Sequence, residues 1–550
     1  MAFAELLDQV GNLGRFQILQ IVFLCTTIII MYPHLFLENF TAAIPAHRCW
    51  VHLLDNDTIS ANDTGTLSQE DLLRVSIPLD SSLRPEKCRR FIHPQWQLLH
   101  QNGTFPNVTE LDTEPCVDGW VYDRSTFSST IVTEWELVCE SQSLRLVVQS
   151  VLMTGALLGS PVYGYLSDRF GRKLGLRLSI LQLAITGTSA AMAPNLLIYS
   201  SLRFLAGFCI TVIVSNSCAL MLEWVQPQSR ALVTMLMLNV CSAGQILLGG
   251  LASAIQDWRT LMLIFSVPLF VNFLVSRKLV ESAQWLIISN RIEEGVKELR
   301  RAARINGRLH AEENLTFEFV KSTMQKELDT PQVKISVFEL FRAPKLRLRV
   351  CFTSLLRFAT GLTFYGLALN VQYFGKSIFL AQILFGSVIL ASRCVFYPAL
   401  NHIGRRTSQL LLFFTSGLCF LAIAFLFQEM PSTCAVLATV GISVISIINI
   451  IACLHHNELI PTILRLTSGG IQVLTSRTGA ALAPLVMILG VYSLHLPWII
   501  YGVICILAGL ASQALPETKD CPLPNTIQDM ENDTRESRKI RQEDMKITQF

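Results

Sequence analysis

The fold is decided by two stretches, GYLSDRFGRK (164–173) and ALNHIGRR (399–406). The Gly-Arg motif of the earlier stretch recurs in the later one at an offset of 233 residues. Both stretches are basic and both follow long apolar segments. Two further pairs recur at offsets of 235 and 236 residues: Glu223 and Arg230 with Glu458 and Arg465, and Glu281 with Glu517. One pair could arise by chance, but three pairs at a nearly constant offset predict two homologous halves.

The composition indicates a membrane protein. The 550 residues are 51% hydrophobic and 15% charged, whereas soluble domains carry about 25% charged residues. About 20 apolar residues suffice for a helix to cross a bilayer, and we predict an all-α fold with six such helices in residues 17–280 and six in 349–515. The spans are 17–37, 146–166, 174–193, 197–222, 231–253, 261–280, 350–371, 378–400, 409–427, 435–453, 468–492 and 498–515. The 44 Lys and Arg nearly balance the 41 Asp and Glu, which argues against nucleic-acid binding.

The distribution of basic residues predicts the orientation. Thirteen Lys or Arg lie between Arg291 and Arg349, the turns 168–173 and 404–406 are basic, and the short loops of the other side are nearly uncharged. Because basic loops stay in the cytoplasm, both termini are expected there. The cytoplasmic segments are then 1–16, 281–348 and the polar, disordered tail 516–550. The apolar spacing of residues 292–307 predicts short amphipathic helices in the loop.

Residues 38–145 form a long predicted extracellular loop. Its four cysteines favour two disulfides, but four cysteines allow three pairings and all three remain open. The cysteines are Cys49, Cys88, Cys116 and Cys139. Five N-glycosylation sequons occur at Asn39, Asn56, Asn62, Asn102 and Asn107, of which Asn39 lies close to the predicted membrane. Their number predicts a glycoprotein.

The repeated motifs place charged residues at the cytoplasmic ends of helices. We expect them to pair across the two halves when that face is closed and to separate when the halves rock. The competing interpretation is that the arginines only set the topology. The candidate gating residues are Asp168, Arg169, Gly171, Arg172, Glu223, Arg230 and Glu281 in the first half, and Gly404, Arg405, Arg406, Glu458, Arg465 and Glu517 in the second.

Three arginines in the apolar spans are candidates for the site, whereas Arg177 and Arg203 lie near predicted span ends. Arg477 lies near the middle of its span, Arg393 lies in the eighth span, and Arg357 lies in the first turns of the seventh, where it could also snorkel. No Asp or Glu lies away from a helix end in any span. Buried cations without buried carboxylates favour anions over cations, although each arginine could instead be structural. No nucleotide-binding G-x4-G-K-[ST] loop, metal-ligand spacing or nucleophile–base set stands out, so we expect no cofactor, no metal and no enzymatic activity.

Several stretches resemble a known family. The long first loop, GYLSDRFGRK, the paired E-x6-R motifs, ESAQW and PETK are similar to those of the organic ion transporter family (solute carrier 22) of the major facilitator superfamily. NFTAAIP (39–45), EPCVDGWVYD (114–123), NELIPT (457–462) and LPWIIYG (496–502) resemble its organic anion branch. MAFAELLDQVG and NTIQDMEND look closest to the members that handle steroid conjugates. The resemblance covers nearly the whole chain.

The resemblance implies substrate roles for particular residues. Arg477 stands where the family has its anion-binding cation, and Arg393 stands where anion members carry lysine. Phe364, Tyr365 and Met31 are expected to line the cavity, with Arg357 as a further candidate. At Cys241 a cavity tyrosine is lost, which would widen the site.

A function follows from that resemblance. It implies a monomeric plasma-membrane carrier that exchanges amphipathic sulfates, glucuronides or carboxylates, such as steroid conjugates, for an intracellular anion. An organic cation or zwitterion carrier is a second hypothesis. A transport-inactive, receptor-like paralogue is a third, because of the departures at Gln284, at Cys241 and at Asn401, which stands where the first half has Asp168.

Overall fold

The computed structural model divides into two compact units. The first comprises Met1–Asn39, Leu146–Ala254 and Arg259–Phe550, and the second comprises Phe40–Arg145 and Ile255–Trp258. The residues described below are 2–11, 13–55, 68–80, 84–99, 112–328, 337–375, 377–399, 403–426, 429–461 and 464–519.

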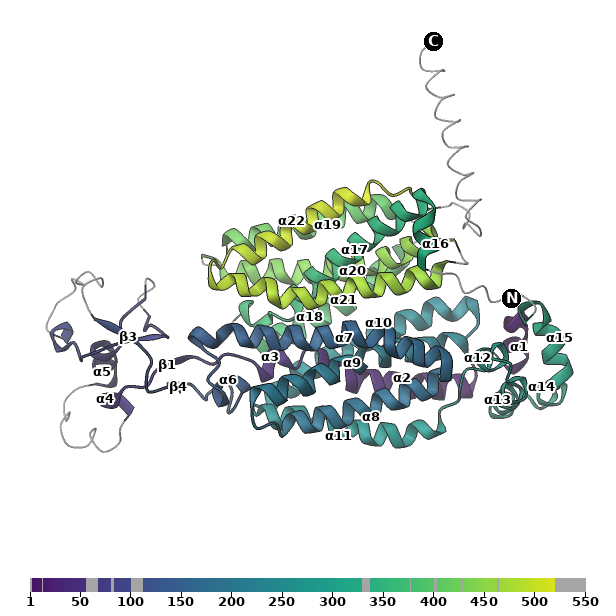
Figure 1. The fold of residues 1–550 in the computed structure, drawn as a ribbon, viewed down its shortest axis with the longest axis horizontal. Coiled ribbons are helices and arrows are strands. Elements are labelled where there is room, and N and C mark those ends of the chain that lie inside the picture. The colour runs from purple at the N-terminus through teal and green to yellow at the C-terminus, as the bar shows by residue number, and fades with distance from the viewer. Residues whose placement is uncertain are drawn as a thin grey trace, which may run out of the picture. The chain divides into compact units, whose positions relative to one another are not determined.

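The first unit is a bundle of long helices arranged as two groups that run side by side (Figure 1). The first half contains α2 (Arg15–Met31), α7 (Gln142–Phe170), α8 (Arg172–Ala191), α9 (Leu196–Glu223), α10 (Pro227–Ala254) and α11 (Trp258–Val275). The second half contains α17 (Pro344–Ala368), α18 (Ile378–Ala399), α19 (Arg405–Leu426), α20 (Pro431–Leu459), α21 (Arg465–Ile488) and α22 (Leu496–Ser512). Among the described residues, eleven helical stretches are long and apolar enough to cross a membrane, and α22 is a shorter apolar helix. The predicted all-helical membrane fold is confirmed.

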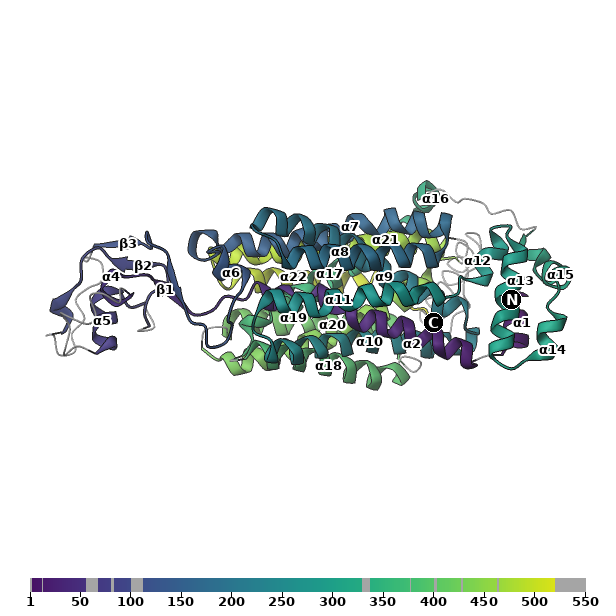
Figure 2. The ribbon, with the colours of Figure 1, turned by 90° about the horizontal axis from the view of Figure 1, so that it is seen from below.

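Short helices gather at the end of the bundle where the repeated motifs lie, here called the motif end (Figure 2). They are α1 (Ala2–Val10), α12 (Ala283–Ile288), α13 (Ile292–Ile305), α14 (Leu309–Asn314) and α15 (Phe317–Leu328), with α16 (Val337–Arg342) preceding α17. Leu6 and Leu7 of α1 are buried in one apolar cluster with Leu299 of α13 and with Trp224 at the end of α9. These helices are therefore packed onto the first half.

Asn306 fastens α1 to this cluster. Its side chain accepts a hydrogen bond from the Phe16 backbone N–H at 2.9 Å and donates to the Val10 carbonyl at 2.9 Å. Helix α1 was not predicted, although Phe3, Leu6, Leu7 and Val10 have the i, i+3, i+4, i+7 spacing of an amphipathic helix.

The second unit is held by two small antiparallel sheets and two disulfides. Strand β1 (His47–Cys49) pairs with β4 (Trp120–Tyr122), and β2 (Arg89–Phe91) pairs with β3 (Thr113–Pro115). Short helices α4 (His52–Asp55), α5 (Gln69–Ser76) and α6 (Ile131–Glu134) complete it, and α3 (Glu38–Thr41) spans the junction of the two units. The disulfides join Cys49 to Cys116 and Cys88 to Cys139, one of the three pairings that the sequence left open.

The predicted glycan at Asn39 does not fit the structure. The Asn39 side chain is only 4% exposed. Its amide nitrogen donates hydrogen bonds to the Ala368 carbonyl at 2.8 Å and to Gln382 Oε1 at 3.0 Å, so the atom that would carry the sugar is enclosed between the two halves. The sequons at Asn56, Asn62, Asn102 and Asn107 lie outside the described residues.

Asn39→Gln is therefore expected to leave the glycosylation of the protein unchanged. The measurement is the electrophoretic mobility of the variant with and without treatment by an N-glycosidase, compared with wild type and with Asn102→Gln. A lighter untreated Asn39→Gln band that converges with wild type after deglycosylation would show that Asn39 carries a glycan.

Candidate functional site

A cavity of about 190 Å³ lies between the two halves of the bundle. The first half contributes α9, α10 and the 3-10 turn η1 (Tyr32–Leu35), and the second contributes α17, α18, α20 and α21. Arg357, Arg393 and Arg477 all line it, together with Phe364 and Tyr365. The structure thus brings together in one place the three arginines that interrupt the apolar spans.

Close packing of α21 on α17 positions Arg477. A Cβ atom added at Gly361 would lie 2.1 Å from the Ser476 carbonyl oxygen, and one added at Gly479 would lie 2.4 Å from that of Phe358. Only glycine permits this approach of the two backbones. Arg477 then donates a hydrogen bond from Nη1 to the Tyr365 hydroxyl at 2.9 Å.

Arg393 connects the two halves. It lies in α18, is only 5% exposed, and donates from Nη1 to the Leu238 carbonyl at 2.7 Å and to Ser242 Oγ at 3.2 Å, both in α10. Its Nε is buried and has no hydrogen-bond partner among the described residues. The guanidinium is anchored through one nitrogen and keeps unused donors.

Arg357 is held within the cavity by α20. It donates to the Asn449 side chain and, at 3.3 Å, to the Asn449 carbonyl, so it does not snorkel to the helix end. Sequence analysis did not select Asn449, although a polar residue in the apolar stretch IINIIACL was a signal for it.

The three guanidinium groups have no acidic partner at this site. None of the residues that line the cavity is Asp or Glu, and no ion pair to the three arginines occurs in the described part of the chain. The fully buried Glu38 carboxylate is not part of the lining, since it pairs with Arg203 at 2.6 Å. Neutral partners orient the arginines without cancelling their charge, so a bound anion would relieve both their desolvation and their mutual repulsion.

Aromatic rings form the apolar part of the site. Tyr365 stacks on Phe36 with ring centroids 6.2 Å apart and packs edge-on against Phe364 at 5.3 Å. Met31 is fully buried and does not line the cavity, which corrects the prediction for this residue. Because α2 ends at Met31, the chain continues into η1 and Tyr32 faces the cavity instead. Cys241 lies in the lining as expected.

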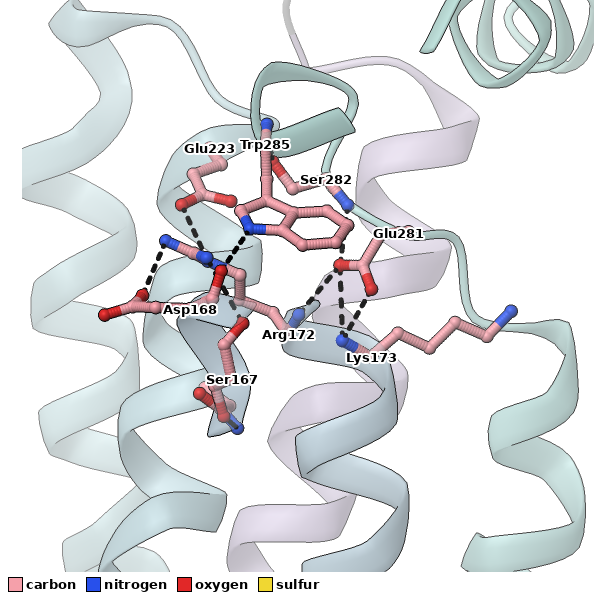
Figure 3. A network of polar contacts seen from close by, with 9 residues as sticks. Ser167, Asp168, Arg172, Lys173, Glu223, Glu281, Ser282 and Trp285 are labelled. Carbon is pink, nitrogen blue, oxygen red and sulfur yellow. Dashed lines mark hydrogen bonds and ion pairs between the residues drawn. The ribbon is translucent and has the colours of Figure 1, made fainter. Parts of the chain in front are cut away.

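The motif residues of the first half form a network at the start of α8 (Figure 3). The Arg172 guanidinium lies 3.3 Å from Asp168 and 3.4 Å from Glu223. The Glu281 carboxylate accepts hydrogen bonds from the backbone N–H groups of Arg172 at 3.1 Å and Lys173 at 3.0 Å. It therefore caps the N-terminus of α8, where backbone donors have no helical partner.

The second half repeats this arrangement. Glu517 accepts from the backbone N–H groups of Arg405 at 2.7 Å and Arg406 at 3.0 Å, and the Arg405 side chain pairs with Glu458 at 3.2 Å. A Cβ atom at Gly404 would lie 2.7 Å from Glu517, and one at Gly171 would lie 2.3 Å from its counterpart Glu281. The repeated glycine thus leaves room for the repeated carboxylate.

The remaining motif arginines bind within their own half. Arg230 donates to the Val225 carbonyl and Arg465 to the Ile460 carbonyl, each at 3.4 Å. The exposed Arg169 donates to the Tyr165 hydroxyl at 3.0 Å, and Arg406 donates to Gln513 Oε1 at 3.1 Å. These hydrogen bonds and ion pairs of the described motif residues each join residues of one half. None of them is the pairing across the halves that is predicted for the closed face.

The sequence is similar to a known protein family and to several named proteins. Residues 140–484 match the family model described as Major Facilitator Superfamily. The chain is 61% identical over 552 residues to the human protein named steroid transmembrane transporter SLC22A24 and 60% identical to its namesake from Equus caballus, with all of each chain covered. It is 56% identical to human solute carrier family 22 member 10, covering 97% of this chain and 98% of that relative.

The fold is also shared with solved structures. The inward open conformation of the xylose transporter XylE from E. coli aligns with a TM-score of 0.57 at 18% identity, covering 73% of this chain and 91% of that chain. At this identity the similarity shows the fold alone.

The two carboxylate caps should differ in how they tolerate loss of charge. Burial raises the pKa of Glu281, whereas for Glu517 burial is outweighed by backbone N–H groups that lower its pKa. The uncharged form is thus relatively favoured at Glu281 and disfavoured at Glu517. Glu517→Gln should lower the free energy of unfolding by about 1 kcal/mol, as for a lost helix cap, and Glu281→Gln by less.

The measurement is the apparent melting temperature of the purified variants in one detergent at neutral pH. By linkage, the contribution of Glu517 is present at neutral pH and is lost as the pH falls through its lowered pKa. A larger loss for Glu281→Gln than for Glu517→Gln would contradict the assignment.

Proposed function

Because this chain belongs to the major facilitator superfamily, and within it to solute carrier family 22, we propose that it is a secondary active carrier of organic anions in the plasma membrane. That it is a membrane transporter and not an enzyme follows from its family. The observation that carries the proposal is the cavity with three guanidinium groups and no acidic lining residue. The same observation disfavours an organic cation as substrate, because a cation would meet only like charge.

The proposed substrates are amphipathic anions such as steroid sulfates, glucuronides and lipophilic carboxylates. A planar guanidinium binds the oxygens of carboxylate or sulfate through two parallel hydrogen bonds, a role that suits Arg477 and Arg393. Phe364, Tyr365 and Val473 offer apolar surface to a ring system. Relatives named steroid transmembrane transporters support this substrate class.

Alternating access is supported by the contacts between the two halves. At the end opposite the motifs, Ser150 Oγ donates to the Ala481 carbonyl at 2.7 Å and Asn39 binds Ala368 and Gln382. At the motif end, the hydrogen bonds and ion pairs given above for the motif residues lie within one half. Because its loops are rich in Lys and Arg, we assign the motif end to the cytoplasm, with both termini, and interpret this conformation as closed toward the outside.

Exchange against an intracellular anion has a physical rationale. Closing the cavity while it is empty would bury three uncompensated positive charges, whereas closing it around an anion pairs them. The empty carrier should therefore reorient more slowly than the loaded one. The carrier is proposed to work as a monomer, with glycans at Asn56, Asn62, Asn102 and Asn107.

Arg477→Ala should reduce uptake of a radiolabelled steroid sulfate by about 10-fold or more, since a hydrogen bond to a charged group contributes about 1.5–3 kcal/mol. Arg477→Lys keeps the charge and should retain part of the uptake. Uptake is measured in transfected cells and normalised to surface biotinylation. Uptake by Arg477→Ala equal to that of wild type, at normal surface abundance, would contradict the role assigned to Arg477. If the wild-type protein transports none of the tested anions, the transport-inactive alternative is favoured.

Tyr365→Phe tests the positioning of Arg477 without removing its charge. The variant keeps the ring stacked on Phe36 and loses the hydroxyl that accepts from Arg477, so KM should rise roughly 5-fold, as for about 1 kcal/mol, with little change in maximal rate. The matched control is Tyr373→Phe, whose hydroxyl lies outside the cavity lining. An unchanged KM for Tyr365→Phe would show that the hydroxyl does not position Arg477.

A further inference from the structure

A group of basic side chains outside the cavity surrounds the start of α8. The Lys173 ammonium donates to the Arg277 carbonyl in the 3-10 turn η5 (Ser276–Lys278) at 3.4 Å. One turn further along α8, the Arg177 guanidinium lies over the Phe273 ring of α11, 5.4 Å from its centroid. Lys173 also interacts electrostatically with Arg177 and with Arg301 of α13.

We define the basic cluster as Lys173, Arg177, Arg277, Lys278 and Arg301. Two carboxylates lie near it, Glu298 and Glu281. Glu298 is 3.6 Å from Arg301, and Glu281 is engaged by the backbone of α8. Five cations against two carboxylates leave an excess of three positive charges. Arg277 and Lys278 are exposed, and the Arg177 Nε has no hydrogen-bond partner among the described residues.

An exposed apolar surface adjoins the basic cluster. Val271 and Leu274 of α11 are 60% and 59% exposed. Leu174 and Leu178 of α8 are also exposed, and they follow Lys173 and Arg177 directly in the sequence. Both helices are long and apolar enough to span a membrane, so these side chains would contact lipid acyl chains. The basic cluster then lies at the level of the headgroups.

The second half lacks this cluster although it repeats the carboxylate cap. At the offset of the repeat, Arg177 corresponds to Leu410, and Arg277 and Lys278 correspond to Gln513 and Ala514. Lys173 alone keeps a basic counterpart, Arg406. The cluster is therefore not needed for capping a helix, and a ligand specific to the first half would account for it.

We propose that the basic cluster binds the headgroup of a phosphoinositide in the cytoplasmic leaflet, with its acyl chains along α8 and α11. Basic pockets beside membrane helices on the cytoplasmic side suit multiply charged lipid headgroups, and a headgroup with several phosphates matches three excess positive charges. The leaflet assignment rests on the proposed orientation of the carrier, whereas lipid binding itself can be measured without transport.

The test uses the full-length protein purified in detergent and native mass spectrometry. Phosphatidylinositol bisphosphate is added, with phosphatidylcholine as the neutral reference. Arg277→Gln with Lys278→Gln should reduce the fraction of protein carrying phosphatidylinositol bisphosphate about 10-fold or more. Arg342→Gln with Arg347→Gln removes the same charge from exposed positions before and within α17 and should leave binding unchanged.

Three results would overturn the proposal. An equal loss of lipid binding in both double variants would show that any basic surface of the protein attracts anionic lipid. Binding of soluble inositol trisphosphate as tightly as phosphatidylinositol bisphosphate would show that the acyl chains contribute nothing, and would identify a site for free phosphate groups instead of a lipid. Unchanged binding by Arg177→Gln, a second variant on a different helix, together with unchanged binding by the first, would place the lipid elsewhere. None of these results bears on uptake of a steroid sulfate, which tests the proposed function separately.

Discussion

Three guanidinium groups share one cavity, and no carboxylate lies among the described residues that line it. Water solvates such groups well, so placing them in the middle of a membrane protein is unfavourable unless something compensates their charge. The structure compensates only in part, through the Tyr365 hydroxyl, the Asn449 amide and a carbonyl and hydroxyl of α10. These neutral partners fix the geometry of the arginines and leave their charge available, which is the basis for proposing an anion as the substrate.

Much of this arrangement could be predicted from the sequence. The repeat and the apolar spans predict two halves, and arginines within apolar spans stand out because charge there is costly. The exact lining could not be predicted, because the end of α2 turns Tyr32 and not Met31 toward the cavity. Asn39 satisfies a sequence pattern for glycosylation, yet its burial depends on residues more than 300 positions away.

The repeated motifs act in a way that their sequence alone did not reveal. Charged residues at helix ends suggested contacts between the halves, but each carboxylate cap and its arginine partners join helices of a single half. Backbone N–H groups at a helix start are strong and fixed partners, whereas ion pairs at an exposed face are weak. In this conformation the motifs join helices within each half, and the proposed pairing across the halves belongs to the state in which the motif end is closed.

The docking of α1 has a practical consequence for imaging. Asn306 and the apolar cluster fasten α1, α13 and α15 to the first half, so these short helices form a folded group attached to that half. A nanobody raised against the exposed side of α13, around Arg304, would move with the first half and stay clear of the cavity lining. Such a marker would give electron cryomicroscopy the asymmetry needed to align particles and to measure the rotation of one half against the other.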